Sequence, residues 1–414
     1  VHLYASVFAI ISSFNRMARQ DVPKENRPNV AIIYSDGSKA SNESKYLAQY
    51  LCGQLASTGY TNMHMISLSP DGMPQQLGNE RISYHGVNSS SKRIEIPVSD
   101  VTYGHFDVLA TCHVIIVCVN SEDTKSCRTK LATVLDQKRQ QKDMNITIFS
   151  LQRGVKNGDA IKSSFTQRKD IAVVGGMVGF ACVPNPKTKS IMPTVNGPCI
   201  TLERIDKEIE NIVIGPCNLI ESMLDVDVYY RKVLSSYTWG VLVWENIHCV
   251  NMLTGGSIYS TLENKEARLI IASMISESVL SLKRAARGGK WKPDFLVYSQ
   301  YLSASTLEKI LCLPTSLCMT LLWCFGVLPH KDIQSPMLID YLEGRVTCNK
   351  TQLGEIVDTG KRYSTPTPVC CAVNQLINEM DTKIGEPKSL LDIENKKYII
   401  QVLKLTLEYI DKEK

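Results

Sequence analysis

The chain has 414 residues, of which 44% are hydrophobic and 21% are charged, and this composition excludes a mostly disordered chain and a protein with many membrane spans. Lys and Arg number 46 against 41 Asp and Glu, so the net charge of +5 is small for this length. No run of basic residues supplies the concentrated face typical of nucleic-acid binding, and nucleic acid is therefore not a favoured partner.

Residues 1–20 contain two arginines, no acidic residue and an apolar spacing typical of an amphipathic helix. This composition is typical of a mitochondrial transit segment, and an ordinary surface helix is the open alternative. We therefore expect a mitochondrial location, either in the matrix or peripheral to the inner membrane, with residues 1–20 as a candidate membrane contact. Residues 1–27 are assigned to an N-terminal extension.

Short apolar runs rich in β-branched residues alternate with helical patterns over residues 28–226. Strands are predicted at 30–34, 64–68, 114–119, 146–149 and 171–174, helices at 45–58 and 122–142, and a polar insertion at 69–100. Buried strands that alternate with helices of this length indicate βαβ units and a parallel sheet. The segment is therefore predicted to form a Rossmann-like domain.

From about residue 228 the hydrophobic period changes to 3.6 residues, and every later element is predicted to be a helix. The predicted helical segments are 228–285, 295–328, 335–360, 366–381 and 388–412. The predicted fold class is α/β, with a Rossmann-like parallel-sheet N-terminal domain followed by an all-helical C-terminal domain. The domains are assigned to residues 28–226 and 227–385, and residues 386–414 to a C-terminal helical extension.

The chain contains 14 cysteines, which raises the question of disulfides or a metal site. Several of them lie inside apolar runs, where a thiol behaves as a small hydrophobic side chain. No Cys-x-x-Cys pair occurs, and the seven histidines are scattered along the chain. We therefore expect a reducing compartment and no structural metal.

Five segments carry a resemblance to one protein family. They are residues 150–155 (SLQRGV), 173–180 (VVGGMVGF), 196–198 (NGP), 239–255, and 335–347 with 365–369. In this order they resemble the ketopantoate reductases (2-dehydropantoate 2-reductases), which belong to the 6-phosphogluconate-dehydrogenase-like oxidoreductases. The resemblance implies the two-domain fold predicted above and an NADPH-dependent reductase as the ancestral activity.

The resemblance also implies a glycine-rich turn after the first strand, because backbone amides there must approach the cofactor pyrophosphate. No GxGxxG pattern can be written at this place, and Asp36 and Glu43 add negative charge where the ligand is anionic. The altered cofactor positions are Tyr34, Ser35, Asp36, Gly37, Asn120 and Arg153. We therefore expect no bound cofactor, although a cradle for another phosphate built from Ser35, Gly37 and Ser38 stays open as an alternative.

The residues that would carry the reductase chemistry are also changed. Val241 matches the lysine of the family that donates a proton to the forming alkoxide, and valine has no proton to donate. One helical turn later, Glu245 replaces an asparagine. Pro336 and Cys348 replace a substrate-holding serine and a glutamate, whereas Asn251 is retained. The expected site therefore has no catalytic residue.

Glu245 and His248 are three residues apart, a spacing that predicts an ordinary helix surface pair in preference to an acid–base pair. A retained scaffold with an emptied site predicts a former enzyme. We expect a structural accessory subunit that binds other protein subunits in a large mitochondrial assembly, with an inner-membrane energy complex such as ATP synthase or a respiratory complex as the favoured candidate. The modest net charge disfavours the mitochondrial ribosome as this assembly. Three alternatives stay open: an accessory protein of that ribosome, an active reductase with a rebuilt site, and a nucleotide-sensing module.

Overall fold

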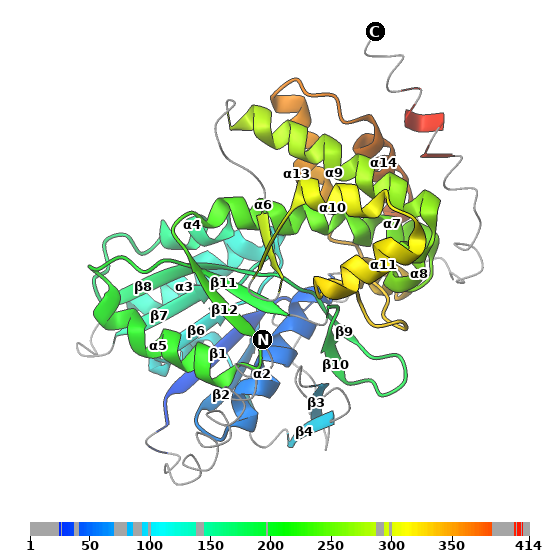
Figure 1. The fold of residues 1–414 in the computed structure, drawn as a ribbon. Helices are drawn as coiled ribbons and strands as arrows, with labels where there is room; N and C mark the ends of the chain where they lie inside the picture. The colour runs from blue at the N-terminus through cyan, green and yellow to red at the C-terminus, as the bar shows by residue number, and fades with distance from the viewer. Residues whose placement is uncertain are drawn as a thin grey trace.

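A computed structural model of the chain combines a sheet domain with a helical domain (Figure 1). It describes residues 25, 27–36, 41–69, 81–85, 93–97, 101–137, 145–195, 198–286, 294–297, 300–382, 401–402, 404–406 and 408. The predicted residues 1–20 lie outside this set, as do residues 196 and 197 of the NGP segment. The predicted fold class is confirmed.

The first domain is built on an eight-stranded sheet with the order β12-β11-β8-β7-β6-β1-β2-β5. Its strands are β1 (Asn29–Tyr34), β2 (Asn62–Ser67), β5 (Val101–Tyr103), β6 (Val114–Val117), β7 (Ile146–Ser150), β8 (Ile171–Val178), β11 (Cys199–Glu203) and β12 (Asp227–Arg231). The strands from β8 to β5 run parallel, and β11 pairs antiparallel with β8. All five strands predicted from the apolar runs are present.

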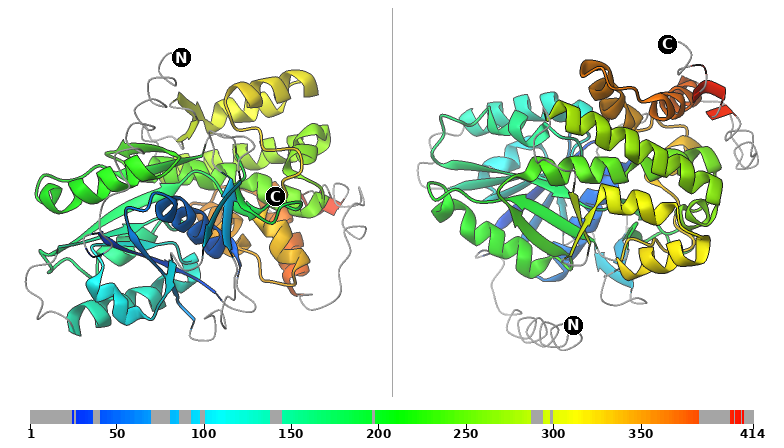
Figure 2. Two further views of the ribbon diagram at one scale, coloured as in Figure 1. Left: turned by 90° about the horizontal axis from the view of Figure 1, so that it is seen from below. Right: turned by 45° about the horizontal axis from the view of Figure 1, so that its top comes forward.

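Helices cover both faces of this sheet (Figure 2). They are α2 (Glu43–Ser57), α3 (Thr124–Gln137), α4 (Asn157–Lys162) and α5 (Glu210–Met223). Val30 and Ile32 of β1 pack in one core with α2 and α5, whereas Ala31 and Ile33 pack in another with α3 and α4. Because both faces are buried, β1 is a continuous apolar run rather than an alternating one.

Two predictions for the first domain were wrong in detail. The segment 69–100 was predicted as a polar insertion, but it contains β3 (Arg81–His85) and β4 (Arg93–Pro97), which join β9 (Cys182–Pro184) and β10 (Ile191–Pro193) in a second sheet. The predicted helical start near residue 228 is instead β12, an edge strand paired with β11. The sheet domain therefore extends to Arg231 rather than residue 226.

The second domain is helical around the long helix α9. Its helices are α6 (Leu234–Trp244), α7 (Asn246–Thr254), α8 (Ile258–Glu263), α9 (Lys265–Ala285), α10 (Ala304–Leu311), α11 (Thr315–Cys324), α12 (Pro336–Leu342), α13 (Leu353–Arg362) and α14 (Pro368–Thr382). A hairpin of β13 (Asp294–Val297) and β14 (Gln300–Ser303) stands where a helix was predicted, and β13 lies against α6. None of the helices that the structure describes has both the length and the hydropathy to span a bilayer.

The described part of the C-terminal extension contacts the helical domain. Val402 is buried in the core of that domain, and Leu405 packs against the same core. The extension therefore belongs structurally to the second domain, which the sequence pattern had not indicated.

Candidate functional site

Three of the predicted site residues follow neighbouring parallel strands. Ser35 follows β1, Asn120 lies beyond β6, and Arg153 lies beyond β7. The carboxyl ends of parallel strands form the edge at which open α/β sheets bind ligands. Glu245 and Asp340 of the helical domain reach the same place. We call this contact region between the two domains the domain junction.

Ser35, the first residue after β1, is held by hydrogen bonds to three neighbouring residues. The Ser35 amide donates to Ser44 Oγ at 2.7 Å, and Ser35 Oγ accepts a hydrogen bond from the Asn120 amide at 2.9 Å. Ser35 Oγ also donates to an oxygen of Asp123. The Ser35 hydroxyl is therefore already engaged within the protein, which argues against Ser35 as a phosphate ligand, whereas Gly37 and Ser38 of the predicted cradle lie outside the described residues.

The neighbouring turn residues are also held within the chain. Tyr34 ends β1 in a buried position, and burial together with the charge of Asp36 raises the pKa of its phenol well above the ordinary value. Asp36 pairs with Lys45, whose Nζ lies 3.5 Å from Oδ2. Gly37 lies outside the described residues.

A carboxylate from the helical domain lies at the start of α2. Asp340 of α12 accepts a hydrogen bond from the Asn42 amide at 3.0 Å and another from Ser41 Oγ at 2.5 Å. Asn42 Nδ2 donates to Glu343 Oε2 at 3.0 Å. Asp340 is only 1% exposed. The first turn of α2 is thus bound to α12 by buried polar contacts.

Arg153 bridges the two domains beside these contacts. Its Nε lies 2.9 Å from Glu43 Oε1, and its Nη1 donates to Glu245 Oε1. Its Nη2 donates to the Phe180 carbonyl at 2.7 Å. Burial disfavours the guanidinium charge, but Glu245 and Glu43 outweigh it and raise the pKa of Arg153. The side chain is therefore a buried, permanently charged bridge between the domains.

Glu245 and His248 are buried, so the prediction of a surface pair was wrong. Burial, with the charge of Glu43, raises the pKa of Glu245 to about 7 against the attraction of Arg153. Burial and the Arg153 charge lower the pKa of His248 to about 3. Glu245 Oε2 and His248 Nδ1 have no hydrogen-bond partner within the described part of the chain. The junction therefore holds a neutral imidazole and a carboxyl that changes charge near neutral pH.

Two other predicted positions lie close to Glu245. Val241 is buried one helical turn before it, and the Glu245 amide donates to the Val241 carbonyl at 2.9 Å. Cys348 is half-buried; burial and then the negative charges of Glu43 and Asp340 raise the pKa of its thiol well above the usual value. Cys348 is therefore a thiol rather than a thiolate nucleophile.

The remaining two predicted positions build the helical framework. Pro336 occupies the first turn of α12, where proline needs no amide hydrogen, and Ser335 caps this helix by accepting from the Leu338 amide at 3.2 Å. Asn251 Oδ1 accepts from the Ser335 amide at 3.0 Å, and its Nδ2 donates to Thr261 Oγ1 at 2.9 Å. Asn251 thus joins α7, α8 and α12 through its side-chain hydrogen bonds.

The structure brings Ser35, Asn120, Arg153, Glu245 and Cys348 together at the junction. Sequence reasoning missed Ser41 and Asp340, and it did not pair Glu43 with Arg153. The available signal was Asp340 itself, an acidic residue within the apolar segment Met337–Tyr341. Such a residue is costly to bury unless it has partners.

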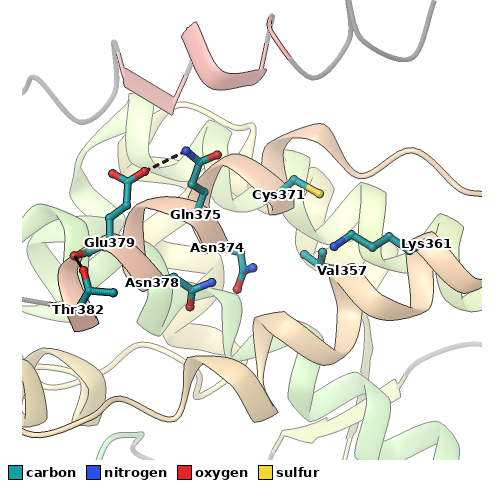
Figure 3. A pocket seen from close by; sticks show the side chains of 8 residues that line it. All are labelled: Val357, Lys361, Cys371, Asn374, Gln375, Asn378, Glu379 and Thr382. Carbon is teal, nitrogen blue, oxygen red and sulfur yellow. Dashed lines mark hydrogen bonds between the residues drawn. The ribbon is translucent and has the colours of Figure 1, made fainter.

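Metal chemistry has no obvious site in the described residues, where no group of three His, Cys, Asp or Glu side chains is placed to hold an ion. A surface pocket of about 400 Å³ lies between α13 and α14 (Figure 3). The side-chain oxygens of Asn374 and Asn378 in its lining accept from Asn349 Nδ2. None of the junction residues lines this pocket, and the junction remains the candidate site.

Neither a protein-family model nor a curated protein matches the sequence. Solved structures do match over most of the chain. A PanE/ApbA family ketopantoate reductase from Ralstonia eutropha JMP134 is 16% identical with a TM-score of 0.58, covering 86% of this chain and 100% of its own. The 2-dehydropantoate 2-reductase from Geobacter metallireducens GS-15 is 14% identical with a TM-score of 0.56, covering 85% and 99%.

A D-mandelate dehydrogenase, solved as a ternary structure with NADH and anilino(oxo)acetate, is 13% identical with a TM-score of 0.56. The match covers 86% of this chain and 100% of the dehydrogenase. At these identities the likeness concerns the arrangement of the backbone. The chain therefore has the fold of the ketopantoate reductases.

Proposed function

We propose that this chain is a catalytically inactive protein with the ketopantoate reductase fold, acting as a structural accessory subunit of a large mitochondrial assembly. The observation that carries the proposal is the Arg153 bridge. Arg153 ties Glu43 of the sheet domain to Glu245 of the helical domain, at the strand edge where this fold binds its ligands. A group that holds the two domains together at that edge leaves little room for a reaction between them.

The nicotinamide dinucleotide implied by the fold does not fit the residues at the start of α2. A pyrophosphate is bound there by free amides at a helix N-terminus. Here the Asn42 amide and the Ser41 hydroxyl already donate to Asp340, and Glu43 adds a second carboxylate. A phosphate at this place would lose its donors and be repelled by two acidic side chains.

The proton donor of a carbonyl reduction is also lacking at the expected position. Val241 carries no ionisable group, and His248 is neutral because its pKa is about 3.

One observation favours the rival function, an active NADPH-dependent 2-dehydropantoate 2-reductase with a rebuilt site. Glu245, with a pKa of about 7 and one oxygen without a partner in the described chain, has the properties of a general acid.

The assembly part of the proposal rests on the sequence. The composition of residues 1–20 favours mitochondrial targeting, and the net charge of +5 disfavours extensive rRNA contact. An inner-membrane energy complex, either ATP synthase or a respiratory complex, is therefore favoured over the mitochondrial ribosome. Its other protein subunits would be the partners, and residues 1–20 are the candidate for peripheral membrane contact.

Calorimetry of the purified chain with NADPH, together with an assay of NADPH oxidation in the presence of ketopantoate, tests the inactive site. We expect neither binding nor turnover, because the phosphate donors are occupied. Turnover that is lost in Glu245→Gln would establish the rival reductase, whereas binding without turnover would indicate a nucleotide sensor.

The accessory role is tested by the size of the native particle. In a gently solubilised mitochondrial lysate, the chain should migrate in native electrophoresis with a complex far larger than its own dimer. Migration as a free monomer or dimer would contradict the accessory role, whatever the enzyme assay shows.

A further inference from the structure

We propose that Asp340 is an internal ligand in place of a phosphate: its carboxyl group fills the start of α2, where this kind of fold binds a phosphate, and so holds the two domains together without a bound molecule. The inference goes beyond the proposed accessory role, since it concerns how the domains are held closed. It rests on the contacts of α2 with α12.

The start of α2 is a favourable place for an anion. The helix has 15 residues, and the first amides of any helix have no partner within it. The aligned peptide dipoles add partial positive charge at the same end. The Asp340 carboxyl group takes this place and accepts from the Asn42 amide on Oδ1 and from the Ser41 hydroxyl on Oδ2.

The residue that should cap α2 does not do so. Asn42 occupies the N-cap position, where asparagine usually accepts a hydrogen bond from the first turn, but its side chain makes no such bond. Its amide group instead donates to Glu343, one turn beyond Asp340. Ser41 Oγ accepts from the Glu43 amide at 3.2 Å, so the start of α2 is satisfied by its own Ser41 together with side chains from α12.

Asp340 is also unusual within its own helix. It is 1% exposed between apolar neighbours, and a carboxyl buried to this degree is unfavourable unless donors satisfy it. Its donors Ser41 and Asn42 lie about 300 residues earlier in the chain, in the other domain. Glu43, Glu343 and Tyr46 face the same carboxyl, and none of them supplies positive charge. The sheet domain thus satisfies Asp340 through the start of α2.

Amide hydrogen exchange and thermal melting of the full chain test this inference, with inorganic pyrophosphate as the probe. In Asp340→Ala we expect exchange in residues 42–46 to accelerate at least about tenfold, because the start of α2 loses the acceptor of its Asn42 amide and Ser41 hydroxyl. Millimolar pyrophosphate should raise the melting temperature of Asp340→Ala and leave that of the unaltered protein unchanged.

Asp358→Ala is the matched control, since Asp358 is an exposed acid on α13 of the same domain. It should behave as the unaltered protein in both measurements. Ser41→Ala provides the same test without a cavity in α12, and it should accelerate exchange in residues 42–46 by a smaller factor. Unchanged exchange in both junction variants, or an equal pyrophosphate response in the unaltered protein and Asp340→Ala, would overturn the inference.

Discussion

Arg153 is the one positive charge that the described structure places between two buried carboxyl groups, Glu43 and Glu245. Replacement of Arg153 by methionine leaves both acids in a region of low dielectric without their counter-charge. Removal of one partner from a buried ion pair typically costs about 3–5 kcal/mol. We expect a loss of that size in the free energy of unfolding of Arg153→Met, measured by urea denaturation.

A surface ion pair is the control for this prediction. Lys187 pairs with Asp332 at 2.8 Å, but the two side chains are 77% and 61% exposed. Lys187→Met should therefore leave the free energy of unfolding nearly unchanged. Combining Arg153→Met with Glu43→Gln should recover part of the loss, because one unpaired acid is removed. An Arg153→Met variant as stable as Lys187→Met would show that the bridge contributes little.

Among the elements, one buried side chain, Arg268, links α9 to the ends of α8 and α10 and to the start of α11. Arg268 of α9 is fully buried and donates to the carbonyls of Leu262 and Glu263 at the end of α8 and to that of Leu311 at the end of α10. It also donates to Leu313 and to Thr315 Oγ1. A cation at two helix C-termini satisfies carbonyls that have no partner in their own helices.

We expect Arg268→Met to lose at least about 3 kcal/mol in the free energy of unfolding, because several buried carbonyls lose their donor at once. Arg268→Lys should lose less, since an ammonium group replaces some of these hydrogen bonds. The control is Arg284→Met at the exposed end of the same helix, which should change stability by no more than about 1 kcal/mol. Equal urea midpoints for Arg268→Met and Arg284→Met would refute the prediction.

The elements also show what the sequence could predict of the fold. β1, β6, β7 and β8 are buried on both faces, and their unbroken apolar runs made them recognisable. β12 was misread because an edge strand need not be apolar, and its residues are half-buried or exposed. The β13–β14 hairpin is too short for its period to be distinguished from that of a helix.

The candidate site was predictable only in part, for a related reason. Ser35, Asn120, Arg153 and Glu245 could be placed because the resemblance to the ketopantoate reductases aligns them with site positions of that family. The residues that these side chains contact in the folded protein could not be predicted from the sequence. The Asp340–Ser41 and Arg153–Glu245 contacts join residues 299 and 92 positions apart, and no local period reports such a pairing.

At the scale of the whole molecule, the buried ionisable groups of the domain junction make the free energy of unfolding depend on pH. Burial raises the pKa of Glu245 and of Asp340 to about 7. Both groups bind protons more tightly in the folded than in the unfolded chain, so their contribution is fully present below about pH 4 and is lost as the pH rises through about 7. His248 acts in the opposite sense: burial lowers its pKa to about 3, so its contribution is present above about pH 6.5 and is lost as the pH falls toward 3.

Each group changes the free energy of unfolding by up to about 1.4 kcal/mol per pH unit within its own window. Between pH 5 and 6.5 two carboxyl groups oppose one histidine, and stability should fall by about 1 kcal/mol per unit as the pH rises. Urea denaturation at pH 5, 6 and 7 should show a flatter profile for Glu245→Gln and for Asp340→Asn, because each removes one carboxyl.

His248→Phe should give the opposite change, a steeper fall between pH 5 and 6.5, because the opposing contribution is removed. Asp332→Asn is the control: Lys187 lowers the pKa of this exposed acid, so its contribution is lost only below the ordinary carboxyl range and the profile from pH 5 to 7 should not change. A profile that Glu245→Gln and Asp340→Asn leave unaltered would mean that the two buried acids stay charged throughout. The two acids would then add no pH dependence to the closed arrangement of the domains between pH 5 and 7, and Arg153 alone would have to stabilise both Glu43 and Glu245 as anions.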